Sequence, residues 1–185
     1  MFAQLDTKSV YSFMDSVVDL NSYIERAKEL GYQALGLMDR DNLYAAYHFA
    51  QLASRNGLRP LIGMEANLFY EGRKIPFRLL AKNNQGYKNL MKLATELSSG
   101  QREFTAFSDY LNAIALILPS EDWEPGMTLG SEVFIGVRPE DAGKEFDYPV
   151  VPLHTVRYFE NADHSTIQML HAISQNVSLS EASIC

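Results

Sequence analysis

The strongest constraint on the fold is an alternation along the chain between two kinds of apolar pattern. Short runs rich in β-branched residues, which are typical of buried strands, are followed by segments whose apolar residues recur at helical spacing. Strands that alternate with helices predict βα units and a mainly parallel sheet or barrel. Seven strands are expected, near residues 2–6, 33–38, 61–69, 75–82, 113–118, 132–137 and 149–154.

Capping residues mark where the expected helices begin. A helix near 20–30 follows Asp19, and a second helix near 42–56 follows Asp41. Asn84 is expected to cap a third helix, because an amide side chain can accept hydrogen bonds from the first backbone N–H groups.

The expected domain organisation follows from the length and the pattern near the end of the chain. With 185 residues and 46% hydrophobic content, the chain has enough apolar side chain for one domain. A turn at 71–72 predicts a hairpin-like link between the third and fourth strands, and the last helix is expected near 163–173. We expect one domain over 1–173 and a polar tail over 174–185 that leads toward further domains.

The single cysteine and the absence of long apolar runs indicate the compartment. Cys185 is the last residue and has no second cysteine with which to form an intrachain disulfide. No stretch approaches the roughly 20 apolar residues of a membrane span, and the first residues lack the pattern of a signal peptide. A soluble, cytoplasmic protein with no membrane partner is expected.

The charge of the chain argues against nucleic-acid binding by this piece alone. Its formal net charge is −7, and the basic residues are scattered among acidic ones. Because phosphate groups repel an acidic surface, we expect no strong binding of DNA.

Candidate functional residues stand at the ends of the expected strands. In a parallel barrel these ends meet at one mouth, and here they carry Asp6, Asp39, Glu65 and His154. Convergent carboxylates would suit a divalent metal ion. The alternative is that each acidic residue is an ordinary turn or helix cap, which is the better interpretation for any one of them alone.

Several long segments carry a resemblance to a known family: AQLDTKSVYSFMD, RAKELGYQALGLMDRDNLYAAYHFAQLA, GLRPLIGMEANLF and LLAKNNQGYKNLMKLA. Together they resemble the PHP (polymerase and histidinol phosphatase) domain at the N-terminus of DnaE-type bacterial DNA polymerase III alpha subunits, and VVPLHTVRYF resembles the family's last metal motif. The resemblance covers roughly residues 2–97 and is weaker over about 100–148, where the family's usual helices are shortened. It implies a distorted, seven-stranded (β/α) barrel of the PHP type, shortened in the middle.

The resemblance also implies a metal cluster, but most of its ligands are replaced. The family's first His-x-His pair falls on Asp6 and Lys8, an outer histidine falls on Gln4, and Asp-His becomes Asp39-Arg40. The glutamate of the family's third motif is retained as Glu65. We interpret these positions as a vestigial metal site, and expect no catalytic residue, no bound metal and no cofactor in this chain: Asp6, Lys8, Asp39, Arg40, Glu65, Pro76, Pro119, Thr155 and Arg157.

The leading hypothesis is a PHP domain kept for a structural or partner-contacting role in DNA replication. Its partners would be the remaining domains of the alpha subunit and other replisome proteins. The parent would be a DNA-directed DNA polymerase, a nucleotidyltransferase whose catalytic residues lie beyond residue 185. The alternative is a metal-dependent phosphoesterase or a proofreading 3'-5' exonuclease of the same family. An unrelated small-molecule enzyme of the TIM-barrel type is a third reading, with no cofactor motif in its favour.

Replacement of metals by side-chain cations predicts a cage of ion pairs. Carboxylates left close together without metal would repel one another unless they find partners. We expect Lys8, Arg40 and Arg157 to pair with Asp6, Asp39 and Glu65. The four histidines, His48, His154, His164 and His171, are expected to be structural or solvent-facing rather than catalytic.

Overall fold

The computed structural model describes residues 3–130 and 132–182. Two features of the sequence analysis, the start of the first strand at Phe2 and the cysteine at 185, lie outside the described residues. None of the helices in the described ranges is long and apolar enough to cross a membrane.

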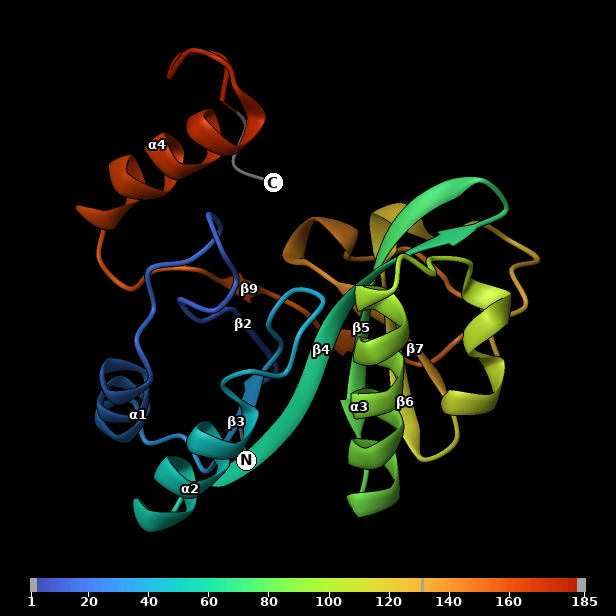
Figure 1. Cartoon of the computed structure of the whole chain (residues 1–185), viewed down its shortest axis with the longest axis horizontal. Coiled ribbons are helices and arrows are strands. Elements are labelled where there is room, and N and C mark those ends of the chain that lie inside the picture. Colours follow the sequence, from blue (N-terminus) through green and yellow to red (C-terminus); the bar gives the residue numbers. More distant parts are fainter. Residues whose placement is uncertain (1–2, 131, 183–185) are drawn as a thin grey trace.

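A mixed sheet of seven strands curls into a half-barrel (Figure 1). Neighbours are parallel except around β5, which is antiparallel to both β4 and β6. The spatial order follows the chain: β1 (Ala3–Gln4), β3 (Ala34–Leu37), β4 (Arg59–Tyr70), β5 (Arg73–Ala81), β6 (Ile114–Pro119), β7 (Val133–Val137) and β8 (Val150–Pro152). The predicted seven-stranded α/β architecture is confirmed as a curled half-barrel.

A second, two-stranded pairing joins the beginning of the domain to its end. β2 (Asp6–Thr7) runs parallel to β9 (Thr155–Val156), with Asp6 opposite Thr155. β2 lies one residue beyond β1, and β9 lies shortly beyond β8, so the pairing links the two edge strands of the large sheet. This pairing places β9, the last strand, next to Asp6 in β2.

The described residues contain four α-helices near the predicted positions, but the second begins four residues later than predicted and two predicted caps are wrong. The helices are α1 (Leu20–Glu29), α2 (Ala46–Arg55), α3 (Asn84–Ser98) and α4 (Asp163–Gln175). Asp19 caps α1 as predicted, whereas α3 is capped by Asn83, not Asn84. Asp41 lies before α2 with a left-handed φ of 54°, and its carboxylate accepts instead from the Asn67 N–H and from Arg102.

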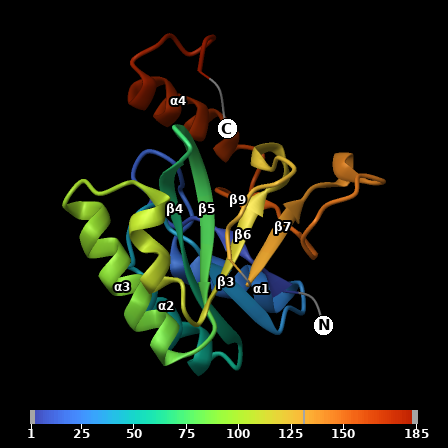
Figure 2. The ribbon, with the colours of Figure 1, turned by 90° about the vertical axis from the view of Figure 1, so that its right-hand side faces the viewer.

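Two large apolar clusters build the fold around the sheet. One packs α3 and the 3-10 helix η1 (Phe104–Tyr110) against β4 to β7, around Phe77, Phe107 and Leu116. The other packs α1 and α2 against β3, around Tyr23 and Phe49, whose rings stack at 5.9 Å. The views from two sides place α3 over β5 and α1 with α2 near β3 (Figures 1 and 2).

The parallel crossover from β6 to β7 has no α-helix in its described part, residues 120–130 and 132. It holds a three-residue 3-10 helix, Ser120–Asp122, and then turns and loop. Parallel strands are usually joined by an α-helix that covers one face of the sheet. The barrel is therefore shortened in the middle, as the resemblance implied, and part of the face of β6 and β7 lies beside a loop.

Candidate functional site

Three of the four residues predicted at strand ends, Asp6, Asp39 and Glu65, lie close together where β2 meets β9. His154 is exposed and apart from them, and Glu65 lies within its strand, not at the end of it. Asp6 lies in β2 and Glu65 lies in β4, while Asp39 follows β3. All three carboxylates are buried, and so is Lys8, which is wholly inaccessible to solvent. Buried charges at this density require partners, because an isolated buried ion costs several kcal/mol.

The ammonium group of Lys8 is the centre of the site. Its Nζ lies 2.7 Å from Oδ1 of Asp6 and 3.0 Å from Oε2 of Glu65. It also donates to the backbone carbonyl of Met38 at 2.7 Å. An ammonium has three donors and no acceptor, so these three contacts use its whole hydrogen-bonding capacity.

Arg78, in β5, completes this centre and was missed in the sequence analysis. Its Nε donates to Oδ2 of Asp6 at 2.9 Å, and its Nη2 lies 3.3 Å from Oε2 of Glu65. Arg78 faces Glu65 directly across the β4–β5 hairpin. The signal was in the sequence, because a two-residue turn at 71–72 places residue 78 opposite residue 65.

Asp39 is satisfied by neutral donors, so its expected pairing with a cation is wrong. It accepts from the backbone N–H of Ser9 and from the hydroxyl groups of Ser9 and Ser12, each at 2.7 Å. A carboxylate held by three short hydrogen bonds needs no cation to be stable when buried.

Asp15 is a second anionic centre, which the sequence analysis also missed. Its carboxylate accepts from Arg40 Nη2 at 2.8 Å and from Arg157 Nε at 3.0 Å. His171, in α4, is buried with its Nε2 3.0 Å from Oδ1 of Asp15. The expected pairing of Arg157 with the strand-end carboxylates is therefore wrong. Asp15 follows no strand, so no local pattern marks it.

Arg40 connects the two centres. Its Nε donates to Oε1 of Glu65 at 3.0 Å, and its Nη2 reaches Asp15. In the described residues, ion pairs thus join three carboxylates and four side-chain cations into one network, which we call the ion-pair cage: Asp6, Asp15, Glu65, Lys8, Arg40, Arg78 and Arg157. Asp39 lies beside the cage, because Ser12, which donates to it, also accepts from the backbone N–H of Arg40.

The remaining positions of the proposed vestigial site differ in their relation to the cage. Thr155 donates through Oγ1 to Oδ2 of Asp6 at 2.7 Å, and the carbonyl of Pro76 accepts from Arg78 at 2.5 Å. Pro119 ends β6, and no hydrogen bond or ion pair of the described residues joins it to the cage.

The electrostatics of the cage keep its central carboxylates ionised. Burial by itself would raise the pKa of Asp6, but the nearby charges of Lys8 and Arg78 outweigh it and lower that pKa. Burial is likewise the largest influence on Glu65, and the same two cations together with Arg40 lower its pKa strongly. The pKa of Arg78 is raised, because Asp6 and Glu65 outweigh the effect of its burial.

The donor set does not fit a divalent metal ion. Carboxylate oxygens that would bind a cation already accept from Lys8 and Arg78, and the ammonium of Lys8 lies between Asp6 and Glu65. Within residues 3–130 and 132–182, no group of three His, Cys, Asp or Glu side chains is arranged to hold a metal. Metal ligands must offer lone pairs, which an ammonium or guanidinium lacks.

Comparison of the sequence with known families shows the class of the protein. The profile of the PHP domain matches residues 4–128, so the chain belongs to the PHP domain family. The chain is 46% identical, over its full length, to the DNA polymerase III subunit alpha of Streptococcus pyogenes serotype M1. It is 32% identical to that of Bacillus subtilis strain 168 over 65% of the chain.

The matched relatives are much longer than this chain. It spans 18% of the Streptococcus pyogenes protein and 11% of the Bacillus subtilis protein.

Solved structures show more distant similarity. An amidohydrolase from Chromobacterium violaceum, with bound sulfate and no metal, aligns over 53% of this chain and 34% of its own, with 20% identity and a TM-score of 0.44. A two-domain Bacteroides vulgatus protein, described as containing a predicted PHP-like metal-dependent phosphoesterase, aligns over 75% of this chain and 39% of its own, with 14% identity and a TM-score of 0.42. Both TM-scores are low, so family membership rests on the sequence match.

Proposed function

We propose that this chain is the PHP domain of a replicative DNA polymerase III alpha subunit, kept as a structural and partner-contacting module whose metal site is replaced by the ion-pair cage. The observation that carries the proposal is the position of Lys8, whose buried ammonium bridges Asp6 and Glu65. In this role the domain is not a catalyst, and DNA synthesis belongs to the rest of the parent protein.

The chemistry of the cage supports a structural role. Either a metal cluster or a set of buried cations can neutralise carboxylates that lie close together. Only a metal, however, offers open coordination positions for water or substrate. Lys8 and Arg78 donate to the carboxylates and leave no acidic centre at which a phosphate ester could be polarised. We therefore interpret the nine positions between Asp6 and Arg157 that fall on the family's metal motifs as a vestigial metal site.

The greater length of the relatives and the net charge of this chain indicate which partners to propose. We propose that the domain contacts the remaining domains of the alpha subunit, and other replisome proteins, in the cytoplasm. The formal net charge of −7 favours protein partners over DNA for this piece. We place the domain at 1–173 and the polar tail at 174–185, close to the end of α4 at Gln175.

Metal titration separates this function from the alternative of a metal-dependent phosphoesterase or proofreading 3'-5' exonuclease. The melting temperature of the chain is measured with Zn²⁺, Mn²⁺ or chelator, and hydrolysis of bis-p-nitrophenyl phosphate and of single-stranded DNA is followed in parallel. We expect no metal-dependent rise in melting temperature and no chelator-sensitive turnover. A rise of several degrees that Glu65→Gln abolishes, together with turnover, would overturn the proposal.

A further inference from the structure

A cavity lined in part by η1 and the ends of β6 and β7 lies away from the ion-pair cage and has no role in the function proposed above. Its volume is about 910 Å³, within the size range of small-molecule binding sites. It lies between η1 and the strands β6 and β7, and the loop of the β6–β7 crossover forms one wall through Thr128, Leu129 and Gly130. The cavity is therefore a consequence of the shortened barrel.

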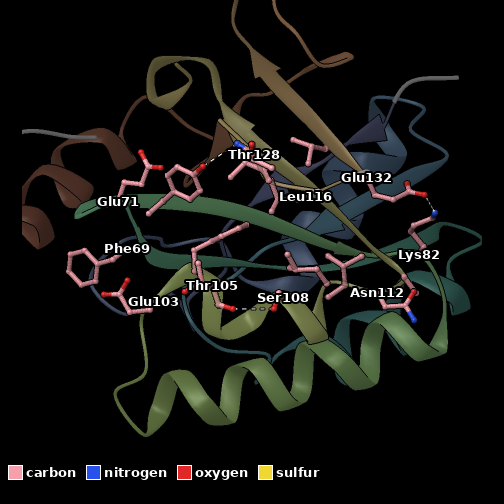
Figure 3. Close-up of a pocket in the computed structure, with 18 of the residues that line it drawn as sticks. Phe69, Glu71, Lys82, Glu103, Thr105, Ser108, Asn112, Leu116, Thr128 and Glu132 are labelled. Carbon is pink, nitrogen blue, oxygen red and sulfur yellow. Dashed lines mark hydrogen bonds and ion pairs between the residues drawn. The ribbon is translucent and has the colours of Figure 1, made fainter. Parts of the chain in front are cut away.

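The floor of the cavity is apolar, and its ends are polar. Leu116 and Val133 belong to the main core cluster and face the cavity from β6 and β7. Such a floor stabilises a bound apolar group through the hydrophobic effect. Figure 3 shows the two ends: Phe69, Glu71 and Glu103 at one, and Lys82, Asn112 and Glu132 at the other.

The two ends differ in charge. At one end Lys82 and Glu132 neutralise each other at 2.8 Å. At the other end Glu71 and Glu103 form no ion pair in the part of the chain that the structure describes. Among the described lining residues, three carboxylates and one ammonium leave a net charge of −2.

An aromatic ring accompanies the two unpaired carboxylates. Phe69 is 38% exposed and lies beside Glu103 through a backbone bridge between the two residues. The face of an aromatic ring attracts organic cations, and adjacent carboxylates strengthen that attraction. The charge at this end of the cavity is thus complementary to a cation and opposed to an anion.

We propose that this cavity binds a small organic cation, an apolar body that ends in an ammonium or guanidinium group. The apolar body lies over Leu116 and Val133, and the cationic group lies between Glu71 and Glu103 against the ring of Phe69. The site is independent of the ion-pair cage, so it does not rest on the function proposed for the domain.

Two probes with the same apolar body and opposite charge test the site. The 185-residue chain is titrated with 4-phenylbutylamine and separately with 4-phenylbutyrate at pH 7, and amide chemical shifts are followed by NMR. For a probe of this size we expect a dissociation constant on the order of 1 mM for the amine and binding weaker by roughly tenfold or more for the carboxylate. The shifts should map to the residues that line the cavity.

Variants then assign the charge recognition to the two glutamates. Glu71→Gln with Glu103→Gln should weaken amine binding by roughly tenfold, whereas Glu25→Gln, on the exposed face of α1, should leave it unchanged. Thr105→Trp, which places a large ring at the exposed wall of the cavity, should block both probes. Equal affinity for the two probes, shifts that map outside the cavity, or no saturable binding would each overturn the proposal.

Discussion

The ammonium of Lys8 lies 2.7 Å from the carboxylate of Asp6, with both side chains wholly buried. Replacing one partner of such a pair leaves the other as an uncompensated buried charge. In Lys8→Met, Asp6 and Glu65 both lose their shared donor, so we expect the free energy of unfolding to fall by about 3–5 kcal/mol.

Urea denaturation at pH 7 measures this loss. Lys82→Met is the matched control, because Lys82 pairs with Glu132 at the surface, where each side chain is nearly half exposed. Exposed pairs are worth about 1 kcal/mol or less, so the control should change stability little. Similar losses for the two variants would contradict the central role of Lys8.

Arg78 and Arg40 should contribute unequally although both donate to Glu65. The side chain of Arg78 is 8% exposed, whereas that of Arg40 is 42% exposed and is screened by solvent. We expect Arg78→Met to cost about 3–5 kcal/mol of unfolding free energy and Arg40→Met about 1 kcal/mol. Chemical denaturation of both variants under the same conditions checks the order, and a larger loss for Arg40→Met would refute it.

The sequence predicted most of the fold because the signals were local. Strand runs, the turn at 71–72 and the cap at Asp19 depend on neighbouring residues, and the structure confirms them. The caps at Asp41 and Asn84 failed for different reasons. The carboxylate of Asp41 instead accepts hydrogen bonds from Asn67 and Arg102, which lie in distant segments of the chain. The helix predicted to follow Asn84 begins one residue earlier than predicted.

The candidate site was only partly predictable, because all of its ion pairs except Lys8–Asp6 join residues that are distant in the sequence. Arg78 could have been found from the register of the predicted hairpin. Asp15 and His171 are 156 residues apart, and no periodicity or motif relates them. Their contact depends on where the tertiary fold places α4, which the pattern of the helix itself does not determine.

The cage should make the protein sensitive to acid. The pKa values of Asp6 and Glu65 are lowered from ordinary values of 3.8 and 4.5 by the surrounding cations. Below those ordinary values the unfolded chain binds protons that the folded chain does not, so stability rises with pH in that window. The stabilisation is fully present above about pH 5 and is lost as the pH falls through 4.5 and 3.8 toward the lowered folded values.

Urea midpoints measured from pH 7 to pH 3 test this dependence. We expect a steep fall below about pH 5. Asp6→Asn with Glu65→Gln should be less stable at pH 7, because Lys8 and Arg78 lose their partners, but its stability should fall less steeply with pH, because neither group titrates. A stability that is flat or rises on acidification of the unmodified chain would show that the carboxylates are not held ionised.

His171 should control how firmly α4 is held to the half-barrel. Few residues of this helix are buried, and Met169 and Ile173 are exposed, so its apolar contact with the domain is limited. In His171→Leu the hydrogen bond to Asp15 is lost, while Asp15 keeps Arg40 and Arg157 as partners. We therefore expect local opening of α4 without a large loss of global stability.

Hydrogen exchange measured by mass spectrometry separates these two effects. A hydrogen bond to a charged group contributes about 1.5–3 kcal/mol, so the amides of residues 163–175 should exchange roughly 10- to 100-fold faster in His171→Leu. The amides of β4 and β5 should exchange at an almost unchanged rate. His164→Leu makes the same substitution at an exposed position of the same helix and should leave exchange in α4 unaltered. If exchange accelerates equally in α4 and in the central strands, the histidine stabilises the whole domain, and α4 opens only when the half-barrel unfolds.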